Sequence, residues 1–187
     1  MNDAHLQFCA SPEWRQMVEQ IVLPEALRQV ELGTDVIEIG TGPGFTTDVL
    51  RTLTDHLTAV EIDPALASAL GSRLAGTNVE VVCGNATALD LPRARFTGAA
   101  SFHMLHHVPT VEAQDTALSE LARVLVPGGV LVVADGVASD AGLAFHAGDT
   151  YNTIEVDGLE DRVRRAGFSS VEIRLHDFGW ICTGVAV

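Results

Sequence analysis

The stretch VIEIGTGPGFTT, residues 36–47, places three glycines within five positions directly after a run rich in branched apolar residues. Such a run is typical of a buried strand, and a helical pattern follows it at 44–54. A glycine-rich turn between a strand and a helix lies where a doubly wound sheet binds its ligand, at the carboxyl edge. Glycine permits a tight turn and close approach of a ligand, and the helix N-terminus offers free N–H groups to a negative group. The loop therefore predicts a ligand site.

Four further segments resemble the strand before this loop, because they are apolar at nearly every position. They are LTAVEI (57–62), VEVVC (79–83), TGAASF (97–102) and GVLVVAD (129–135). Continuous apolar runs are typical of parallel strands that are covered on both faces. Helical patterns at 64–75 and 110–125 separate the strands, and this alternation predicts a doubly wound α/β sheet.

The last thirty or so residues break the alternation. A helical pattern at 157–167 with Asp157 as its N-cap is followed by two strands, SSVEIRLH (169–176) and WICTGVAV (180–187). The link between these strands is too short for a parallel crossover, so we expect them to pair antiparallel. The pattern predicts a mainly parallel sheet that ends in an antiparallel hairpin.

Composition excludes several classes of partner. The chain has 11 Lys and Arg against 25 Asp and Glu, a net charge of −14, which repels a nucleic-acid backbone. Its three cysteines, Cys9, Cys83 and Cys182, lack metal-binding spacing and favour a reducing compartment. The sequence shows neither an apolar stretch of the roughly 20 residues that a membrane span needs nor a signal peptide. We therefore expect a soluble, cytoplasmic protein that binds neither nucleic acid nor membrane.

An acidic residue identifies the chemical class of the ligand. Glu61 closes the second predicted strand, where a carboxylate can accept hydrogen bonds from ribose hydroxyls. A dinucleotide fingerprint requires a small residue at its sixth position, which is Phe45 here, and the nucleoside-triphosphate loop pattern is absent too. A nucleoside-containing ligand is expected, and a nicotinamide-dependent oxidoreductase is disfavoured.

Five motifs in order carry a family resemblance: VIEIGTGPG, AVEIDP, GNATALDLP, SFHMLHHV and LARVLVPGGVLVVAD. Together they resemble class I S-adenosylmethionine-dependent methyltransferases of the small-molecule type, in the ubiquinone/menaquinone-biosynthesis group (methyltransferase domain type 11). The resemblance implies a Rossmann-like α/β sheet of seven strands, mainly parallel with one antiparallel strand. It also implies S-adenosylmethionine as cofactor, a small-molecule acceptor and S-adenosylhomocysteine as product. The tetrapeptides NPPY and DPPY, which serve enzymes that methylate amino groups of nucleobases or glutamine, are replaced by SFHM.

The resemblance also implies the cofactor-binding residues, which are Glu38, Gly40, Gly42, Gly44, Glu61, Ile62, Asn85, Ala86 and Phe102. Glu38 and the glycines would line the methionine and ribose part, and Glu61 would hold the ribose diol. Ile62 would pack on the adenine, whose edge Asn85 and Ala86 would meet. The family usually has aspartate where Asn85 stands, but the asparagine can accept through its carbonyl oxygen and can also donate.

A general base is required only if the acceptor carries a proton on its nucleophilic atom. His103 and Asp135, which end the fourth and fifth predicted strands, are the catalytic candidates. The cluster HMLHH also contains His106 and His107, of which at least one is expected to pack or cap. No carboxylate or cysteine stands at ligand spacing from them, so we expect no metal site.

We expect one methyltransferase domain over residues 1–187. Its parts are an N-terminal helical lid (1–32), a cofactor-binding core (33–135), a substrate-side loop or short helix (136–156), and a last helix with the antiparallel hairpin (157–187). Lid residues that could reach the acceptor are Phe8, Trp14, Met17, His146, Asp149 and Tyr151. A homodimer is left open. The alternative function is a non-catalytic S-adenosylmethionine-binding module that acts as a sensor or partner subunit.

Overall fold

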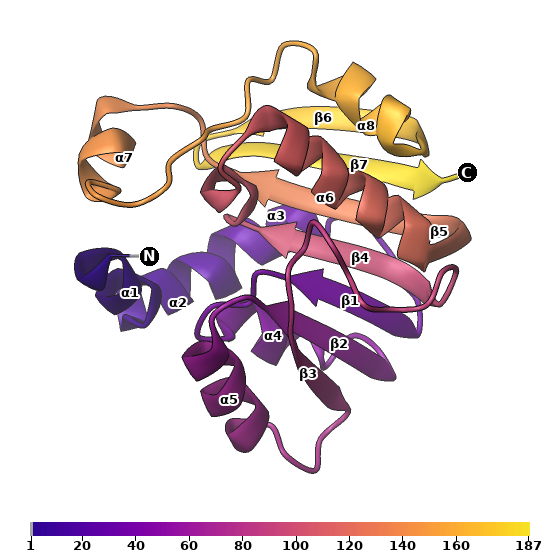
Figure 1. Cartoon of the computed structure of the whole chain (residues 1–187), viewed down its shortest axis with the longest axis horizontal. Helices are drawn as coiled ribbons and strands as arrows, with labels where there is room; N and C mark the ends of the chain where they lie inside the picture. The colour runs from indigo at the N-terminus through magenta and orange to yellow at the C-terminus, as the bar shows by residue number, and fades with distance from the viewer. Residues whose placement is uncertain (1) are drawn as a thin grey trace.

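The computed structural model describes residues 2–187, which fold around a seven-stranded sheet in the order β3-β2-β1-β4-β5-β7-β6 (Figure 1). The strands are β1 (Asp35–Ile39), β2 (His56–Glu61), β3 (Val79–Cys83), β4 (Phe96–Phe102), β5 (Leu125–Asp135), β6 (Phe168–His176) and β7 (Gly179–Ala186). Strands β1 to β5 pair in parallel, whereas β7 runs antiparallel to both β5 and β6. The predicted Rossmann-like sheet, with one antiparallel strand in a C-terminal hairpin, is confirmed.

The strands are apolar because both faces of the sheet are covered. Successive side chains of a strand point to opposite faces. In β1, Ile37 and Ile39 join the core beneath α6 (Val111–Val124) and α8 (Leu159–Ala166), whereas Val36 joins the core on the other face. That second face carries η1 (Val18–Val22), α3 (Leu23–Ala26), α4 (Phe45–Leu50) and α5 (Pro64–Arg73). Figure 1 shows α6 in front of the sheet and α3 behind it.

The sequence predicts two helices within the lid at 1–32, one over 12–22 with Ser11 as N-cap and one from Pro24 to Gly33. The first forms α2 (Pro12–Met17) and η1 with the expected cap, but the second, α3, stops at Ala26. It stops because Gln29 adopts a left-handed conformation (φ 64°), which ends a right-handed helix. An additional short helix, α1 (Asp3–Cys9), precedes them and is capped by Asn2.

Two helix boundaries elsewhere also differ. Helix α4 ends at Leu50 rather than at 54, because Asn78 donates its side-chain amide to the carbonyls of Arg51 and Thr54. These bonds satisfy carbonyls that the helix end leaves without partners. Helix α8 is capped by Gly158 (φ 81°) rather than by Asp157. Neither difference moves a residue of the predicted ligand site.

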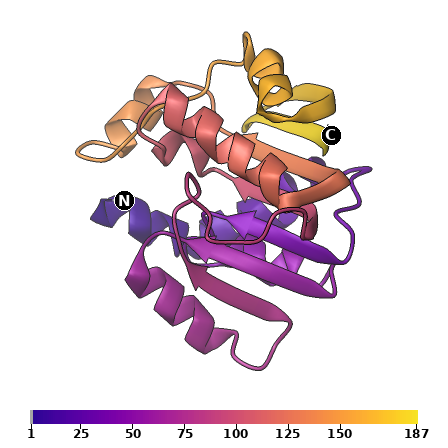
Figure 2. The same cartoon turned by 45° about the vertical axis from the view of Figure 1, so that its right-hand side comes forward.

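Two segments distant in sequence lie beyond the carboxyl ends of β1 and β4 (Figures 1 and 2). They are the N-terminal helices α1 and α2, and α7 (Asp140–Phe145), which is the short helix expected within 136–156. The side chain of Asn2 joins them, because its amide donates to the carbonyls of Phe145 and Ala147 at 3.0 and 3.2 Å. Within residues 2–187, no helix has the length and apolar character that a membrane span requires.

Candidate functional site

A cavity of about 860 Å³ lies at the carboxyl edge of the sheet, under α1 and α7. Its volume is in the range of small-molecule sites. The predicted residues that line it are Gly40, Gly42, Glu61, Ile62, Asn85, Ala86, Phe102 and His103, with Phe8, Trp14, His146 and Asp149 from the lid. The predicted site residues that lie outside its wall are Glu38, Gly44, Asp135, Met17 and Tyr151. The cavity therefore joins the predicted cofactor residues to those predicted for the acceptor.

The three glycines of the loop are required for different reasons. All adopt positive φ values, 74° at Gly40, 51° at Gly42 and 91° at Gly44, which side chains disfavour. A Cβ at Gly40 would lie 1.9 Å from Cγ of Met104, and a Cβ at Gly44 would lie 2.4 Å from Cδ1 of Leu70. At Gly42, no atom of the described chain lies within 4 Å of such a Cβ, and the residue faces the cavity. Internal packing thus accounts for Gly40 and Gly44, whereas the space beside the Gly42 backbone is open to the cavity.

Glu61 lies at the floor of the cavity with only 5% of its surface exposed. Its Oε2 accepts from the Gly42 N–H at 2.8 Å and its Oε1 accepts from the Asp63 N–H at 3.0 Å. A carboxylate offers about four lone-pair sites, so two of them stay available to a ligand. Because the two hydroxyls of a ribose need two such acceptors, the residues fit the expected nucleoside.

Glu38 lies behind the cavity wall rather than in it, and is 1% exposed. Thr46, which lines the cavity, donates its hydroxyl to one carboxylate oxygen, and Thr47 donates to the other at 2.6 Å. Burial raises the pKa of Glu38 to about 7, although both hydrogen bonds act in the opposite direction. Through these hydrogen bonds Glu38 links the end of β1 to the start of α4, and so stabilises the glycine loop between them.

Asn85, predicted to meet the adenine edge, lines the cavity, and its side-chain oxygen is already bonded within its own turn. Its Oδ1 accepts from both the N–H and the hydroxyl of Thr87, each at 2.9 Å. Both donors oblige the oxygen to face Thr87, which leaves the amide group to donate to a ligand. Beside it, Ile62 is 65% exposed at the cavity mouth, where a flat apolar ring could pack on it.

Asp135 reaches the cavity through His106, one of the two HMLHH histidines of which at least one was expected to pack or cap. Oδ1 of Asp135 lies 2.6 Å from Nδ1 of His106, and Oδ2 accepts from the His106 N–H at 3.1 Å. Although burial raises the pKa of Asp135, its hydrogen bond with His106, the nearby His106 and His103 rings and the hydrogen bond from the Gly136 N–H outweigh that effect and hold the pKa below its ordinary value. A carboxylate can only accept, so Nδ1 of His106 carries a proton, and the lone pair of the neutral tautomer is on Nε2. The sequence signals for this pair were Asp135 at the end of the fifth predicted strand and the HMLHH segment after the fourth.

His103 is held in an unusual backbone conformation at the end of β4, with φ 51°. Its N–H donates to the carbonyl of Ala134 at 2.8 Å, and its ring lies edge-on to Trp14 with 5.2 Å between centroids. Its Nε2 is buried without a hydrogen-bond partner in the described part of the chain. Burial lowers the pKa of His103, so the ring is neutral at physiological pH.

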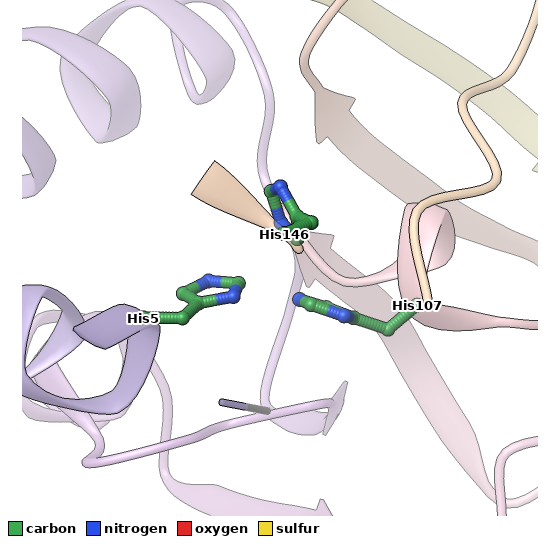
Figure 3. Close-up of side chains that lie close together, drawn as sticks. All are labelled: His5, His107 and His146. Carbon is green, nitrogen blue, oxygen red and sulfur yellow. The ribbon is translucent and has the colours of Figure 1, made fainter. Parts of the chain in front are cut away.

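Three histidines from distant segments meet at the lid side of the cavity (Figure 3). His5 belongs to α1, His107 to η2 (Leu105–His107), and His146 follows α7. Centroids of the His5 and His146 rings are 4.5 Å apart, and those of His5 and His107 are 4.8 Å apart. The sequence indicated His146 and His107 separately, but it gave no signal for His5.

The family model of a methyltransferase domain (type 11) matches residues 37–133, a range that contains the glycine loop, Glu61, Asn85 and His106. The chain belongs to this family. The expected class I S-adenosylmethionine-dependent methyltransferase, and with it the cofactor, is confirmed.

Individual relatives and structures agree with this assignment. Over 121 residues the chain is 31% identical to an uncharacterized methyltransferase of Mycobacterium bovis, an alignment that covers 64% of this chain and 59% of that protein. The methyltransferase chain thus spans less than two thirds of this relative's length. A S-adenosylmethionine-dependent methyltransferase of Aquifex aeolicus superposes with a TM-score of 0.75 at 18% identity, covering 100% of this chain and 98% of that one. N-methyltransferase NodS of Bradyrhizobium japonicum, in complex with S-adenosyl-L-homocysteine, gives 0.71 at 16% identity, covering 99% and 93%. Both show the same fold.

Proposed function

We propose that this methyltransferase chain transfers the methyl group of S-adenosylmethionine to a small-molecule acceptor and releases S-adenosylhomocysteine. The observation that supports this proposal most directly is the division of one cavity between two kinds of residue. Gly42 and Glu61 line it at the ends of β1 and β2, where a nucleoside would bind. His103 and His106 line it after β4, where an acceptor could give up a proton. The cofactor and the acceptor would therefore meet in one cavity.

The residues of the chain position the cofactor and the acceptor, whereas the reactive bond belongs to the cofactor. When bound, the cofactor supplies a sulfonium whose methyl group is already reactive. Glu61 fixes the ribose, and Gly42 lets the ligand approach the backbone closely. The aromatic lid residues Phe8, Trp14 and Phe145 line the cavity and would limit the access of water to it. Alignment of the acceptor with the methyl group is worth about 7–11 kcal/mol of barrier.

His106 is the proposed general base for an acceptor that carries a proton. Asp135 holds the ring by its Nδ1, which leaves Nε2 to take the proton. Asp135 is then a positioning residue rather than a direct contact. His103, whose Nε2 is buried without a hydrogen-bond partner in residues 2–187, is the second candidate for the same role.

The acceptor is proposed to be a small molecule that is largely apolar or neutral. The cavity of about 860 Å³ is covered by aromatic side chains, which suit an apolar body. The net charge of −14 opposes polyanions such as nucleic acids, which are not proposed as partners.

Calorimetric titration of S-adenosylmethionine and S-adenosylhomocysteine, with NADH as control ligand, tests the cofactor half of this proposal. We expect Glu61→Gln to weaken both adenosyl ligands by about 10- to 100-fold, because a hydrogen bond to a charged group is worth about 1.5–3 kcal/mol. The matched control is Glu31→Gln, at an exposed position, which should leave affinity unchanged. A folded wild-type protein that binds neither adenosyl ligand would overturn the proposal.

Transfer itself is tested with S-adenosylmethionine labelled in its methyl group and a panel of small acceptors. A methylated product is expected, and His106→Gln should lower the rate by about 100-fold or more for an acceptor that must lose a proton. Tight cofactor binding without a product from any acceptor would favour the alternative, a non-catalytic binding module.

A further inference from the structure

We propose that His5, His107 and His146 form a binding site for a divalent transition-metal ion, Zn²⁺ by its ligand preference, at the lid side of the cavity. Figure 3 shows the three rings turned toward a common point from three separate segments. One possible ligand atom of each residue lies within 4.8 Å of those of the other two. Imidazole nitrogens suit zinc, and three histidines with a fourth position open to solvent or substrate are a ligand set that zinc uses.

The geometry needs only small movements to close around an ion. An equilateral triangle with edges of 4.8 Å has its centre about 2.8 Å from each corner, whereas a zinc–nitrogen bond is about 2.0–2.1 Å. Each nitrogen would therefore move inward by about 0.7 Å. His5 and His146 lie on short lid helices or beside them, which can supply such a shift.

Two ring nitrogens in this cluster are buried without a hydrogen-bond partner among residues 2–187. They are Nδ1 of His5 and Nε2 of His146. Buried polar atoms in native proteins nearly always have partners, so such an atom calls for a ligand. For His146 the tautomer is fixed, because Nδ1 lies 2.7 Å from the Gly142 carbonyl and must donate to it. In the neutral tautomer its Nε2 therefore carries the lone pair, and a backbone partner of this kind is what orients metal-binding histidines.

A carboxylate lies beside the three rings. Oδ2 of Asp149 lies 3.6 Å from Nδ1 of His5 and adds negative charge beside the cluster.

A bound ion would connect α1, η2 and the segment after α7, which approach one another at this point of the described chain. It would thereby hold the lid over the cavity and present its fourth position to the acceptor. The expectation of no metal site, drawn from the HMLHH spacing alone, would then be revised, because two of the three ligands lie outside that motif. The site does not depend on methyl transfer, so metal binding can be measured by itself.

The test uses the full chain, purified without an added histidine tag and freed of metal by a chelator. Titration with Co²⁺ should produce the visible absorption of a low-coordinate cobalt site at one ion per chain, and Zn²⁺ should displace it. Zn²⁺ calorimetry should give a micromolar or tighter Kd. His5→Gln and His146→Gln should each weaken Zn²⁺ at least 100-fold, whereas His56→Gln, on the exposed start of β2, should not.

Two further readouts separate the outcomes. Circular dichroism and S-adenosylhomocysteine binding show whether each variant is folded and whether the cofactor site is intact, so failure of the metal proposal cannot be mistaken for failure of the methyltransferase proposal. Zn²⁺ should also protect residues 139–149 from proteolysis in the wild type but not in His146→Gln. No binding to folded wild type, or binding that His5→Gln and His146→Gln leave unchanged, would overturn the proposal and leave the cluster as aromatic packing.

Discussion

Glu38 shows how one buried carboxyl group links pH to the stability of this fold. Its pKa in the folded chain is about 7 because of burial, whereas an unfolded glutamate has a pKa of about 4.3. The folded state therefore binds a proton more tightly than the unfolded state. The stability that this proton provides is complete below about pH 4.3 and is lost as pH rises through about 7.

We expect Glu38→Gln to remove this pH dependence, because the amide is neutral at every pH. Relative to wild type, the variant should gain about 3 kcal/mol of unfolding free energy between pH 4 and pH 8. Urea unfolding at both pH values measures the difference, in which any constant effect of the amide cancels. Glu31→Gln, at an exposed position, is the control. A gap between variant and wild type that is equal at the two pH values would contradict the expectation.

At the residue scale, the sequence predicts which residues belong to the site better than it predicts the contacts that require them. The glycines at 40, 42 and 44 and the acid at 61 follow from local motifs, which spacing along the chain can show. That Gly40 must avoid Met104, or that His106 takes Asp135 as its partner, depends on strands being neighbours in space. His5 meets His146 only after the whole sheet has formed between them, so no local pattern could have indicated it.

At the scale of secondary-structure elements, helix α1 depends on one residue. Asn2 caps it by accepting from the His5 N–H at 2.8 Å, and the same side chain donates to the carbonyls of Phe145 and Ala147. A helix of 7 residues is marginal by itself, so these tertiary bonds help to keep it in place. A sequence pattern so short carries little signal, which is why α1 was not predicted.

We therefore expect Asn2→Ala to loosen both halves of the lid, at a cost of about 1–2 kcal/mol in local stability. Hydrogen exchange should rise in residues 3–9 and also in 139–149, although the two segments are far apart in sequence. Ser11→Ala removes only the cap of α2, a bond of 3.1 Å to the Trp14 N–H, and is the matched control. Equal hydrogen exchange at 139–149 in the two variants would contradict the proposed link between α1 and residues 139–149 through Asn2.

Gln114 ties together several parts of the whole molecule from the middle of α6. It is fully buried, and its Nε2 donates to the carbonyls of Leu105 and Asn152, while its Oε1 accepts from Arg162 of α8 at 3.0 Å. One amide thus connects η2, the segment after α7, and α8. The sequence predicts Gln114 only as one position of the helix at 110–125. Its role could not be predicted, because its hydrogen-bond partners lie on three other segments.

Replacement of this amide by an apolar group of similar size should destabilise the molecule as a whole. We expect Gln114→Leu to lower the free energy of unfolding by about 3 kcal/mol, because it leaves buried carbonyls without donors. Gln16→Leu, which removes an exposed bond to Gln20, should change it by less than about 0.5 kcal/mol. Urea unfolding followed by circular dichroism compares the two, and similar midpoints would show that the amide is dispensable.

The strand order has a consequence for how such a protein can diversify. Because β1 and β4 are central neighbours, the chain builds one half of the sheet outward to β3 before it returns to build the other. Gly42, Glu61 and Asn85 end or follow strands of the first half, and His103, His106 and Asp135 end or follow strands of the second. In the proposed function, the residues that would hold the nucleoside and the candidate general bases therefore lie in separate stretches of the sequence. Substitutions in the second stretch would then change the base while the first stretch keeps its residues for the methyl donor.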